Sequence, residues 1–326
     1  MSEFDLINRL QEIICIPPGH AIAECIVGIG DDGAVLDVPA GRDLVVCTDT
    51  LVAGVHFPAA TAPAAIGHKA LAVNLSDLAA MGAEPAWFFM ALTLPTEDRG
   101  WLDAFAAGMA ELAADAGIVL AGGDVTSGPL SITVTALGLV GKGGALVRSG
   151  AAAGDLVVVS GTPGAAAHAL AVLKEGETPA AADLSALDYP VPRLVLGRAL
   201  RGFATACIDV SDGLAADLGH VLEQSGVGAE VDLDKLPSPA SLSTVPAEDR
   251  WTLQLAGGDD YELCFTVPAG SANRLDKISE ECEIELTVIG LITQKPGLVF
   301  RTAEGEVYDP VISGYRHFDG PGIEHL

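Results

Sequence analysis

The sequence predicts a mixed α/β (α+β) protein built from two domains. Its 326 residues are about twice the length of a common domain. Short apolar runs typical of strands alternate with segments of helical periodicity along the whole chain. The glycine-rich stretch 141–154 interrupts this alternation near the middle. We therefore expect an N-terminal domain over residues 1–143 and a C-terminal domain over residues 150–326.

The first half contains long helical segments between strands. Apolar residues at helical spacing predict helices over 3–14, 63–81 and 98–116. Apolar or alternating runs predict strands over 34–38, 43–48, 87–94, 118–121 and 130–140. The strand that contains Val45–Cys47 is expected to end next to Asp49, and the strand that contains Val119–Ala121 is expected to end in the Gly-Gly-Asp of 122–124.

The second half continues the alternation. Helices are predicted over 164–175, 192–202, 213–225 and 247–256. Strands are predicted over 155–160, 205–209, 228–233 and 261–267. The segment that contains Pro179 and Pro190 is expected to be a loop. A further helix and two strands precede a polar tail.

The charge of the chain narrows its possible partners. Asp and Glu number 44 against 17 Lys and Arg, which gives a net charge of −27. Such a surface repels a phosphate backbone, so we expect no nucleic-acid partner. The longest uncharged stretch, 125–141, carries Ser, Thr, Gly and Pro and alternates like a strand, so we expect no membrane span. The acidic N-terminus does not resemble a signal peptide, so a cytoplasmic location is expected.

The six cysteines form neither a CxxC pair nor a zinc-ligand spacing. Several lie in apolar runs, such as Cys207 in ATACIDV and Cys264 in YELCFTV. We expect them to be reduced and to pack as small hydrophobic residues.

A glycine loop near the N-terminus carries two carboxylates. Gly28, Gly30 and Gly33 match the GxGxxG pattern of dinucleotide-binding proteins. That pattern requires a helix after the loop, whereas the following AVLDVP looks like a strand. Two carboxylates would also repel a pyrophosphate. We interpret the loop as presenting Asp31 and Asp32 to a metal ion.

Acidic residues recur next to apolar strands. Asp49 follows the apolar run Val45–Cys47 and has Thr48 and Thr50 beside it. An unpaired carboxylate in such a place is costly, and a metal ion would remove that cost. The alternative is that Asp49 caps a turn. His56, which follows, is by itself more often a structural histidine than a ligand.

Three further segments repeat this pattern. Asn74 and Asp77 share a face of the helix predicted over 63–81, where a polar pair needs a partner. The segment 122–124 places two glycines before Asp124, and the segment 209–212 carries Asp209, Ser211 and Asp212. Ser211 or Asp212 alone can be explained as a helix cap. Oxygen ligands without His or Cys suit Mg²⁺, which would neutralise a triphosphate. No GxxxxGK[ST] motif occurs, which excludes a Walker-type site.

These segments, in this order, resemble the thiamine-monophosphate kinase family, within the superfamily of aminoimidazole ribonucleotide synthetase and selenophosphate synthetase. The resemblance covers nearly the whole chain. It rests on GIGDDGAVL, TDTLVAGVHF, KALAVNLSDLAAMGAEP, LAGGD, IDVSDGL, GGDDYELCFTV and GYRHF. Two positions depart from the family pattern. Asp259 stands where Glu is usual, and Cys47 stands where Ser is common. Because a thiol is a poor Mg²⁺ ligand, the Cys47 side chain is not expected to bind the ion.

The resemblance implies the fold, the reaction and the site residues. The fold is two-domain and aminoimidazole-ribonucleotide-synthetase-like, the N-terminal sheets of a homodimer pair into a barrel, and ATP binds between the domains. The implied reaction is transfer of a phosphoryl group from ATP to thiamine phosphate, with several Mg²⁺ ions. The implied Mg²⁺ positions are Asp32, Cys47 through its backbone, Thr48, Asp49, Asp77, Asp124, Asp209 and Asp212. The implied nucleotide contacts are Gly123, Asp124, Arg148 and Ser211, and the implied substrate contacts are His56, Asp259 and Tyr315.

The acceptor in this reaction is a phosphate monoester that is already anionic, so no general base is needed. We expect direct in-line transfer, with Asp49, Asp77, Asp124 and Asp209 as the catalytic residues. Two alternatives remain open. One is a related ATP-dependent enzyme with another oxygen nucleophile as acceptor. The other is a non-catalytic protein that binds divalent cations.

Overall fold

The computed structural model describes residues 3–14 and 22–309, which divide into two units. The first unit comprises the described residues up to Leu78 together with Ala83–Ala145. The second comprises Ala79–Gly82 and the described residues from Leu146 onward. Tyr315 lies outside the described residues, and so does the GYRHF motif.

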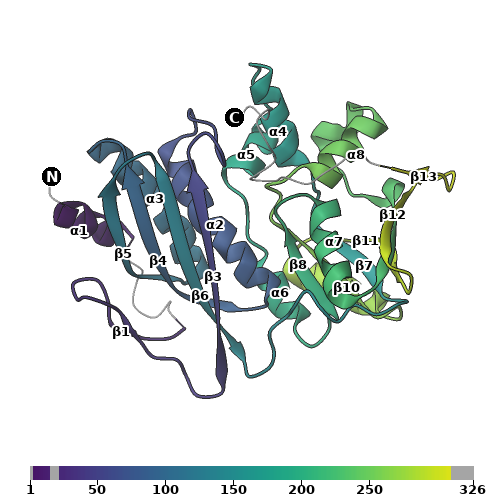
Figure 1. Ribbon diagram of the computed structural model, residues 1–326, viewed down its shortest axis with the longest axis horizontal. Helices are drawn as coiled ribbons and strands as arrows, with labels where there is room; N and C mark the ends of the chain where they lie inside the picture. The colour runs from purple at the N-terminus through teal and green to yellow at the C-terminus, as the bar shows by residue number, and fades with distance from the viewer. Residues whose placement is uncertain (1–2, 15–21, 310–326) are drawn as a thin grey trace. The chain divides into compact units, whose positions relative to one another are not determined.

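The first unit is built on a four-stranded sheet in the order β3-β6-β4-β5, with β4 and β5 parallel and the other pairs antiparallel. Its strands are β3 (Arg42–Val52), β4 (Glu84–Leu94), β5 (Val119–Ser127) and β6 (Ser131–Gly141). A two-stranded sheet consists of β1 (Cys25–Val27) and β2 (Val35–Leu36). The helices are α1 (Glu3–Ile13), α2 (Pro63–Ala80) and α3 (Arg99–Ala116). Figure 1 shows α2 and α3 lying along one face of the larger sheet.

Burial follows from this arrangement. Fully buried apolar side chains of α2 and α3, such as Leu71, Leu75 and Phe105, pack on the covered face. The other face carries a smaller cluster in which Trp87 and Leu137 pack with residues of β1 and β2. The helix α3 is capped at its N-terminus by Asp98, whose side chain accepts the Trp101 N–H at 3.0 Å.

The second unit is built on a seven-stranded sheet in the order β13-β12-β9-β11-β7-β10-β8. Its strands are β7 (Leu156–Ser160), β8 (Ala206–Val210), β9 (Gly228–Asp232), β10 (Glu262–Val267), β11 (Leu286–Thr293), β12 (Gly297–Arg301) and β13 (Val307–Tyr308). Its helices are α4 (Ala165–Lys174), α5 (Ala181–Asp188), α6 (Leu194–Leu200), α7 (Leu214–Ser225), α8 (Ala247–Ala256) and α9 (Ala272–Cys282). Two short 3₁₀ helices are η1 (Leu233–Lys235) and η2 (Ala240–Thr244).

This sheet is covered on both faces. Val157 and Val159 of β7 belong to one apolar cluster, with residues of α7 and α8. Val158, which lies between them, belongs to another cluster, with residues of α6 and α9. Because successive side chains of a strand point to opposite faces, each face has its own core.

The mixed α/β class is confirmed, but three local expectations were wrong. The strands β3 and β5 do not end before Asp49 and Asp124. They continue to Val52 and Ser127, because Asp49 pairs with Val134 and Asp124 pairs with Ala91. The segment expected to be a loop contains α5, since Pro179 and Pro190 lie outside its two ends and do not interrupt it. None of the helices described is both long enough and apolar enough to cross a membrane.

Candidate active site

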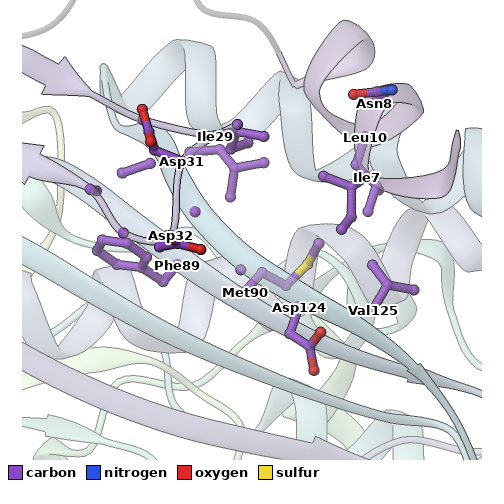
Figure 2. Close-up of a pocket in the computed structure, with 18 residues that line it drawn as sticks. Ile7, Asn8, Leu10, Ile29, Asp31, Asp32, Phe89, Met90, Asp124 and Val125 are labelled. Atoms are coloured by element: carbon purple, nitrogen blue, oxygen red, sulfur yellow. The ribbon is translucent and has the colours of Figure 1, made fainter. Parts of the chain in front are cut away.

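A pocket of about 660 Å³ in the first unit gathers three of the acidic residues that the sequence singled out. Its lining includes Asp31 and Asp32 from the loop between β1 and β2, and Asp124 from β5. Figure 2 shows this loop on one side of the pocket, Ile7 and Leu10 of α1 on the other, and Met90 and Asp124 of the neighbouring strands beneath. Apolar walls around a few carboxylates are typical of a ligand site.

The glycine loop has the backbone that the sequence predicted. It leads into β2 and not into a helix, which confirms that the dinucleotide interpretation fails. Asp31 and Asp32 are both exposed to solvent. They can therefore approach a cation without a large change in the fold.

Gly123, directly before Asp124, allows two strands of the sheet to pack closely. A Cβ atom at Gly123 would lie 2.0 Å from the Met90 carbonyl oxygen, so no side chain fits there. Gly123 is one of the nucleotide contacts that the family resemblance implies. The close approach of β4 to β5 explains the glycine without a ligand.

A second acidic group lies between β3 and α2. The Cys47 thiol donates to the Asn74 carbonyl oxygen at 3.3 Å, which holds α2 against this strand. Burial and the nearby carboxylates of Asp77 and Asp49 raise the pKa of the Cys47 thiol well above its usual value. The thiol and both carboxylates thus share one small polar region beneath the helix.

Thr48 lies on the opposite face of the sheet from this group, because its side chain alternates with those of Cys47 and Asp49. Its hydroxyl lies 2.5 Å from the Thr135 hydroxyl and donates to the Val134 carbonyl oxygen at 3.1 Å. The strand register places Asp124 on the same face as Thr48. The side chains of the first unit that were expected to bind Mg²⁺ therefore form two groups, one on each face of the sheet.

The second unit places three predicted residues at the end of β8. Asp209 is a member of this strand and is 5% exposed. Ser211 and Asp212 come directly after the last residue of the strand, Val210. The backbone N–H groups of Ser211 and Asp212 both donate to Asp217 Oδ2 at 3.0 Å. Burial raises the pKa of the Asp217 carboxyl to about 7, with the Asp209 and Asp212 charges adding to the effect. Asp217, which the sequence analysis missed, fixes the shape of this turn.

Asp259 lies beside the same turn. Its N–H donates to the Ser211 carbonyl oxygen at 2.9 Å, and its Oδ1 accepts the Tyr261 hydroxyl at 3.0 Å. The next residue, Asp260, accepts the Gly164 N–H at 2.8 Å through Oδ1. Burial raises the pKa of the Asp260 carboxyl well above its usual range, as do the charges of Glu262 and Asp259.

His56 and Arg148 are placed differently. His56 Nδ1 accepts the Val52 N–H at 3.0 Å, so the proton of the neutral ring lies on Nε2. Arg148 is exposed. In the part of the chain that the structure describes, its guanidinium forms no salt bridge. It is therefore accessible to an anionic ligand.

Among the described residues, no three side chains of His, Cys, Asp or Glu form a ready-made metal-binding set. The structure thus brings the predicted residues together in three separate groups. These are Asp31, Asp32 and Asp124 around the pocket; Cys47, Asp49 and Asp77 between β3 and α2; and Asp209, Ser211, Asp212 and Asp259 at the end of β8. That all of them surround one set of cations stays a prediction.

Both halves of the chain match known family models. The model of the AIR synthase related protein, N-terminal domain, matches residues 30–140. The model of the AIR synthase related protein, C-terminal domain, matches residues 152–302. The order of the two models along the chain agrees with the predicted superfamily.

The curated relatives are more specific. The thiamine-monophosphate kinase of Escherichia coli strain K12 is 46% identical to this chain over 329 residues, which cover 98% of this chain and 99% of that protein. The chain belongs to the thiamine-monophosphate kinase family. The Bacillus subtilis kinase is 35% identical over 336 residues and is covered completely.

Solved structures of this kinase family have the same fold. The crystal structure of thiamine-monophosphate kinase from Stenotrophomonas maltophilia is 45% identical, with a TM-score of 0.85 over 94% of this chain and 98% of that one. A structure described as AaThiL complexed with AMPPCP and TMP is 27% identical, with a TM-score of 0.76 over 97% of both chains. The hydrogenase maturation protein HypE of E. coli, at 22% identity and a TM-score of 0.77, shares the fold.

Two residues that support the site, Asp217 and Arg193, lie outside the motifs that carry the family resemblance. Asp217 lies five residues after Asp212, in the first turn of α7, where an acidic residue can accept N–H groups of the preceding turn. That spacing could have revealed it. Arg193 donates a hydrogen bond to Glu262, which belongs to the GGDDYELCFTV motif, but the two residues are 69 positions apart and nothing in their local sequence indicates that they meet.

Proposed function

We propose that this protein transfers the γ-phosphoryl group of ATP to thiamine phosphate and so forms thiamine diphosphate. The observation that carries the proposal is the 46% identity over 98% of the chain to a curated thiamine-monophosphate kinase. The relative bound to AMPPCP and TMP supports it, because AMPPCP is an analogue of ATP. ATP is then a co-substrate, and thiamine phosphate is the acceptor.

The carboxylates of the site suit Mg²⁺. Asp32 and Asp124 around the pocket, and Asp49 and Asp77 between β3 and α2, offer oxygen ligands of the kind that hard cations prefer. We propose that these residues, with Asp209, Asp212, the Thr48 hydroxyl and the Cys47 backbone, hold several Mg²⁺ ions. When bound, Mg²⁺ would neutralise phosphate charge. The Cys47 thiol stays protonated and is a poor ligand.

The remaining predicted residues bind and orient the two substrates. The exposed Arg148 is proposed to donate to the nucleotide phosphates, with Gly123 and Ser211 beside them. His56, whose Nδ1 is held by the Val52 N–H, can donate from Nε2 to the acceptor. Asp259 and Tyr315 are proposed to contact thiamine phosphate. Because the acceptor phosphate is already anionic, these residues need only align it for direct in-line transfer.

A homodimer is proposed for the first unit. The strand β3 lies at the edge of its sheet and exposes Leu44 and Val46, which are 41% and 55% exposed. Ile26 and Val35 of β1 and β2 expose further apolar surface, at 57% and 50%. An edge strand with exposed apolar side chains favours pairing with a second copy. We also propose the domain division 1–143 and 150–326, and a cytoplasmic location.

The proposal is tested by offering the protein Mg-ATP with either thiamine phosphate or aminoimidazole precursors and separating the products by chromatography. We expect thiamine diphosphate and ADP in equal amounts from thiamine phosphate, and no turnover of the precursors. ATP consumption with the precursors alone would favour a related enzyme of the superfamily. Radiolabelled phosphate trapped on the protein would contradict direct transfer.

A further inference from the structure

Two residues of the segment Gly257–Tyr261 adopt a left-handed backbone conformation although neither is glycine. The angle φ is 70° at Asp259 and 50° at Tyr261. Asp tolerates this conformation better than most residues, but for a bulky side chain such as Tyr it is an outlier. Residues in such conformations persist only where surrounding contacts hold them. The fold must therefore supply an anchor next to this segment.

Backbone hydrogen bonds provide part of the anchor. The Asp259 N–H donates to the Ser211 carbonyl oxygen at 2.9 Å, and the Tyr261 N–H donates to the Val210 carbonyl oxygen at 2.8 Å. The Tyr261 hydroxyl donates to Asp259 Oδ1 at 3.0 Å. The direction of the Asp259 carboxylate thus depends on where Tyr261 is held.

The carboxylate of Glu262, the residue after Tyr261, is held by two side chains. Glu262 is the first residue of β10 and is 6% exposed. Arg193 donates to both of its carboxylate oxygens, from Nε to Oε2 at 2.7 Å and from Nη2 to Oε1. Ser160 Oγ, at the end of β7, donates to Oε2 at 2.5 Å and accepts the Leu263 N–H at 2.9 Å. The carboxylate therefore joins β7, β10 and the start of α6.

The neighbouring backbone leaves no room for a side chain at Gly161 beside this carboxylate. A Cβ atom at Gly161, where φ is 58°, would lie 2.0 Å from Glu262 Oε1. A buried ion pair of this kind contributes little net stability compared with apolar packing. Its geometry is nevertheless well defined, because the arginine contact is bidentate. These features indicate that the pair sets the position of the chain.

We propose that Glu262, held by Arg193 and Ser160, is a positioning residue that fixes the Asp259–Tyr261 segment and so directs the Asp259 carboxylate toward the acceptor substrate. The inference rests on the proposed function, since Asp259 is assigned to thiamine phosphate there. Glu262 acts through the segment, because both of its oxygens are already engaged by Arg193 and Ser160. Its loss should affect the acceptor more than the nucleotide.

The test compares Glu262→Gln and Arg193→Lys with a matched control, Glu230→Gln. Glu230 forms the same kind of pair with Arg301 in the same unit, from Nε at 2.8 Å, but that pair is exposed. Steady-state rates are measured with either substrate varied, below the melting temperature of each variant. We expect Glu262→Gln to raise KM for thiamine phosphate by about tenfold or more while KM for ATP stays within about twofold.

Arg193→Lys should have a smaller effect in the same direction, because Lys restores the charge without the bidentate contact. Glu230→Gln should leave both constants unchanged. An unchanged KM for thiamine phosphate in Glu262→Gln, or an equal rise in both KM values, would overturn the inference. If Glu262→Gln fails to fold, Arg193→Lys decides by the same criterion. If the wild-type protein forms no thiamine diphosphate, the proposed function itself fails, and the inference fails with it.

Discussion

The carboxylate of Asp217 accepts the backbone N–H of Asp212 at 3.0 Å and thereby closes the turn between β8 and α7. The same oxygen accepts the Ser211 N–H at the same distance. Asp212 is proposed to bind Mg²⁺ and Ser211 to bind the nucleotide, and Asp217 holds the backbone of both residues. Support of this kind is common in metal sites.

Replacing Asp217 by Ala should therefore weaken nucleotide binding. Two N–H groups lose their acceptor, and an unsatisfied group costs about 1–3 kcal/mol. We expect KM for Mg-ATP to rise by about tenfold, measured in the product assay. Asp217→Asn keeps a carbonyl acceptor and should be milder. Equal KM values in the wild-type protein and Asp217→Ala would contradict this role.

Asp49→Asn should abolish most of the activity and leave the fold intact. The change keeps the shape of the side chain but removes the charge proposed to hold Mg²⁺ beneath α2. We expect turnover to fall by about two or more orders of magnitude with a nearly unchanged melting temperature. Asp43→Asn is the control on the same strand. The Asp43 carboxylate already accepts a hydrogen bond from the Lys142 ammonium group at 2.6 Å and is not among the proposed Mg²⁺ ligands. Full activity of Asp49→Asn would refute its assignment.

Cys47→Ala should hardly change the Mg²⁺ requirement. The thiol stays protonated because burial raises its pKa, and sulfur is a poor partner for Mg²⁺. We expect the Mg²⁺ concentration that gives half-maximal rate to shift by less than about twofold, measured by titration. A much larger shift would show that the side chain, and not the backbone, binds the ion.

Asp260→Asn should make stability less dependent on pH. Burial raises the pKa of Asp260 in the folded state, so the folded state binds this proton more tightly than the unfolded state does. The stabilisation from that proton is complete below the unfolded pKa and is lost as pH rises toward the folded value. The slope is up to about 1.4 kcal/mol per pH unit.

Asn removes this loss and keeps an acceptor for the Gly164 N–H. Urea unfolding at about pH 5 and about pH 8 should therefore show that the variant gains stability relative to wild type at the higher pH. A constant difference between the two proteins at both pH values would mean that Asp260 titrates normally. Glu230→Gln serves as the control, because Glu230 is exposed.

The sequence was sufficient for the mixed α/β class and for the long elements, because helical and alternating periods are strong there. The helix α2, predicted over 63–81, spans Pro63–Ala80. Strand ends were harder to predict. The Asp49 and Asp124 positions look like termini by composition, yet pairing with Val134 and Ala91 carries both strands further. Cross-strand pairing depends on distant residues, so no local pattern reveals it.

The site residues, too, could be predicted only where the evidence is local in sequence. Motifs revealed Asp31, Asp32 and Asp124, which the structure brings to one pocket. The separation of Thr48 from Asp49 follows from strand alternation, which could not be applied to Asp49 while the strand was expected to end at residue 48. The contact of Arg193 with Glu262 joins positions 69 residues apart. Such contacts appear only once the fold is known.

The central claim is that aspartates from separate segments bind the divalent cations of one active site. It is tested most directly by crystals of the protein grown with Mn²⁺, an ATP analogue and thiamine phosphate, in which anomalous scattering locates the metal. We predict Mn²⁺ bound by Asp32, Asp49, Asp77, Asp124 and Asp209 next to the nucleotide phosphates. Nucleotide bound without metal, or Mn²⁺ bound only at other acidic residues of the surface, would contradict the account.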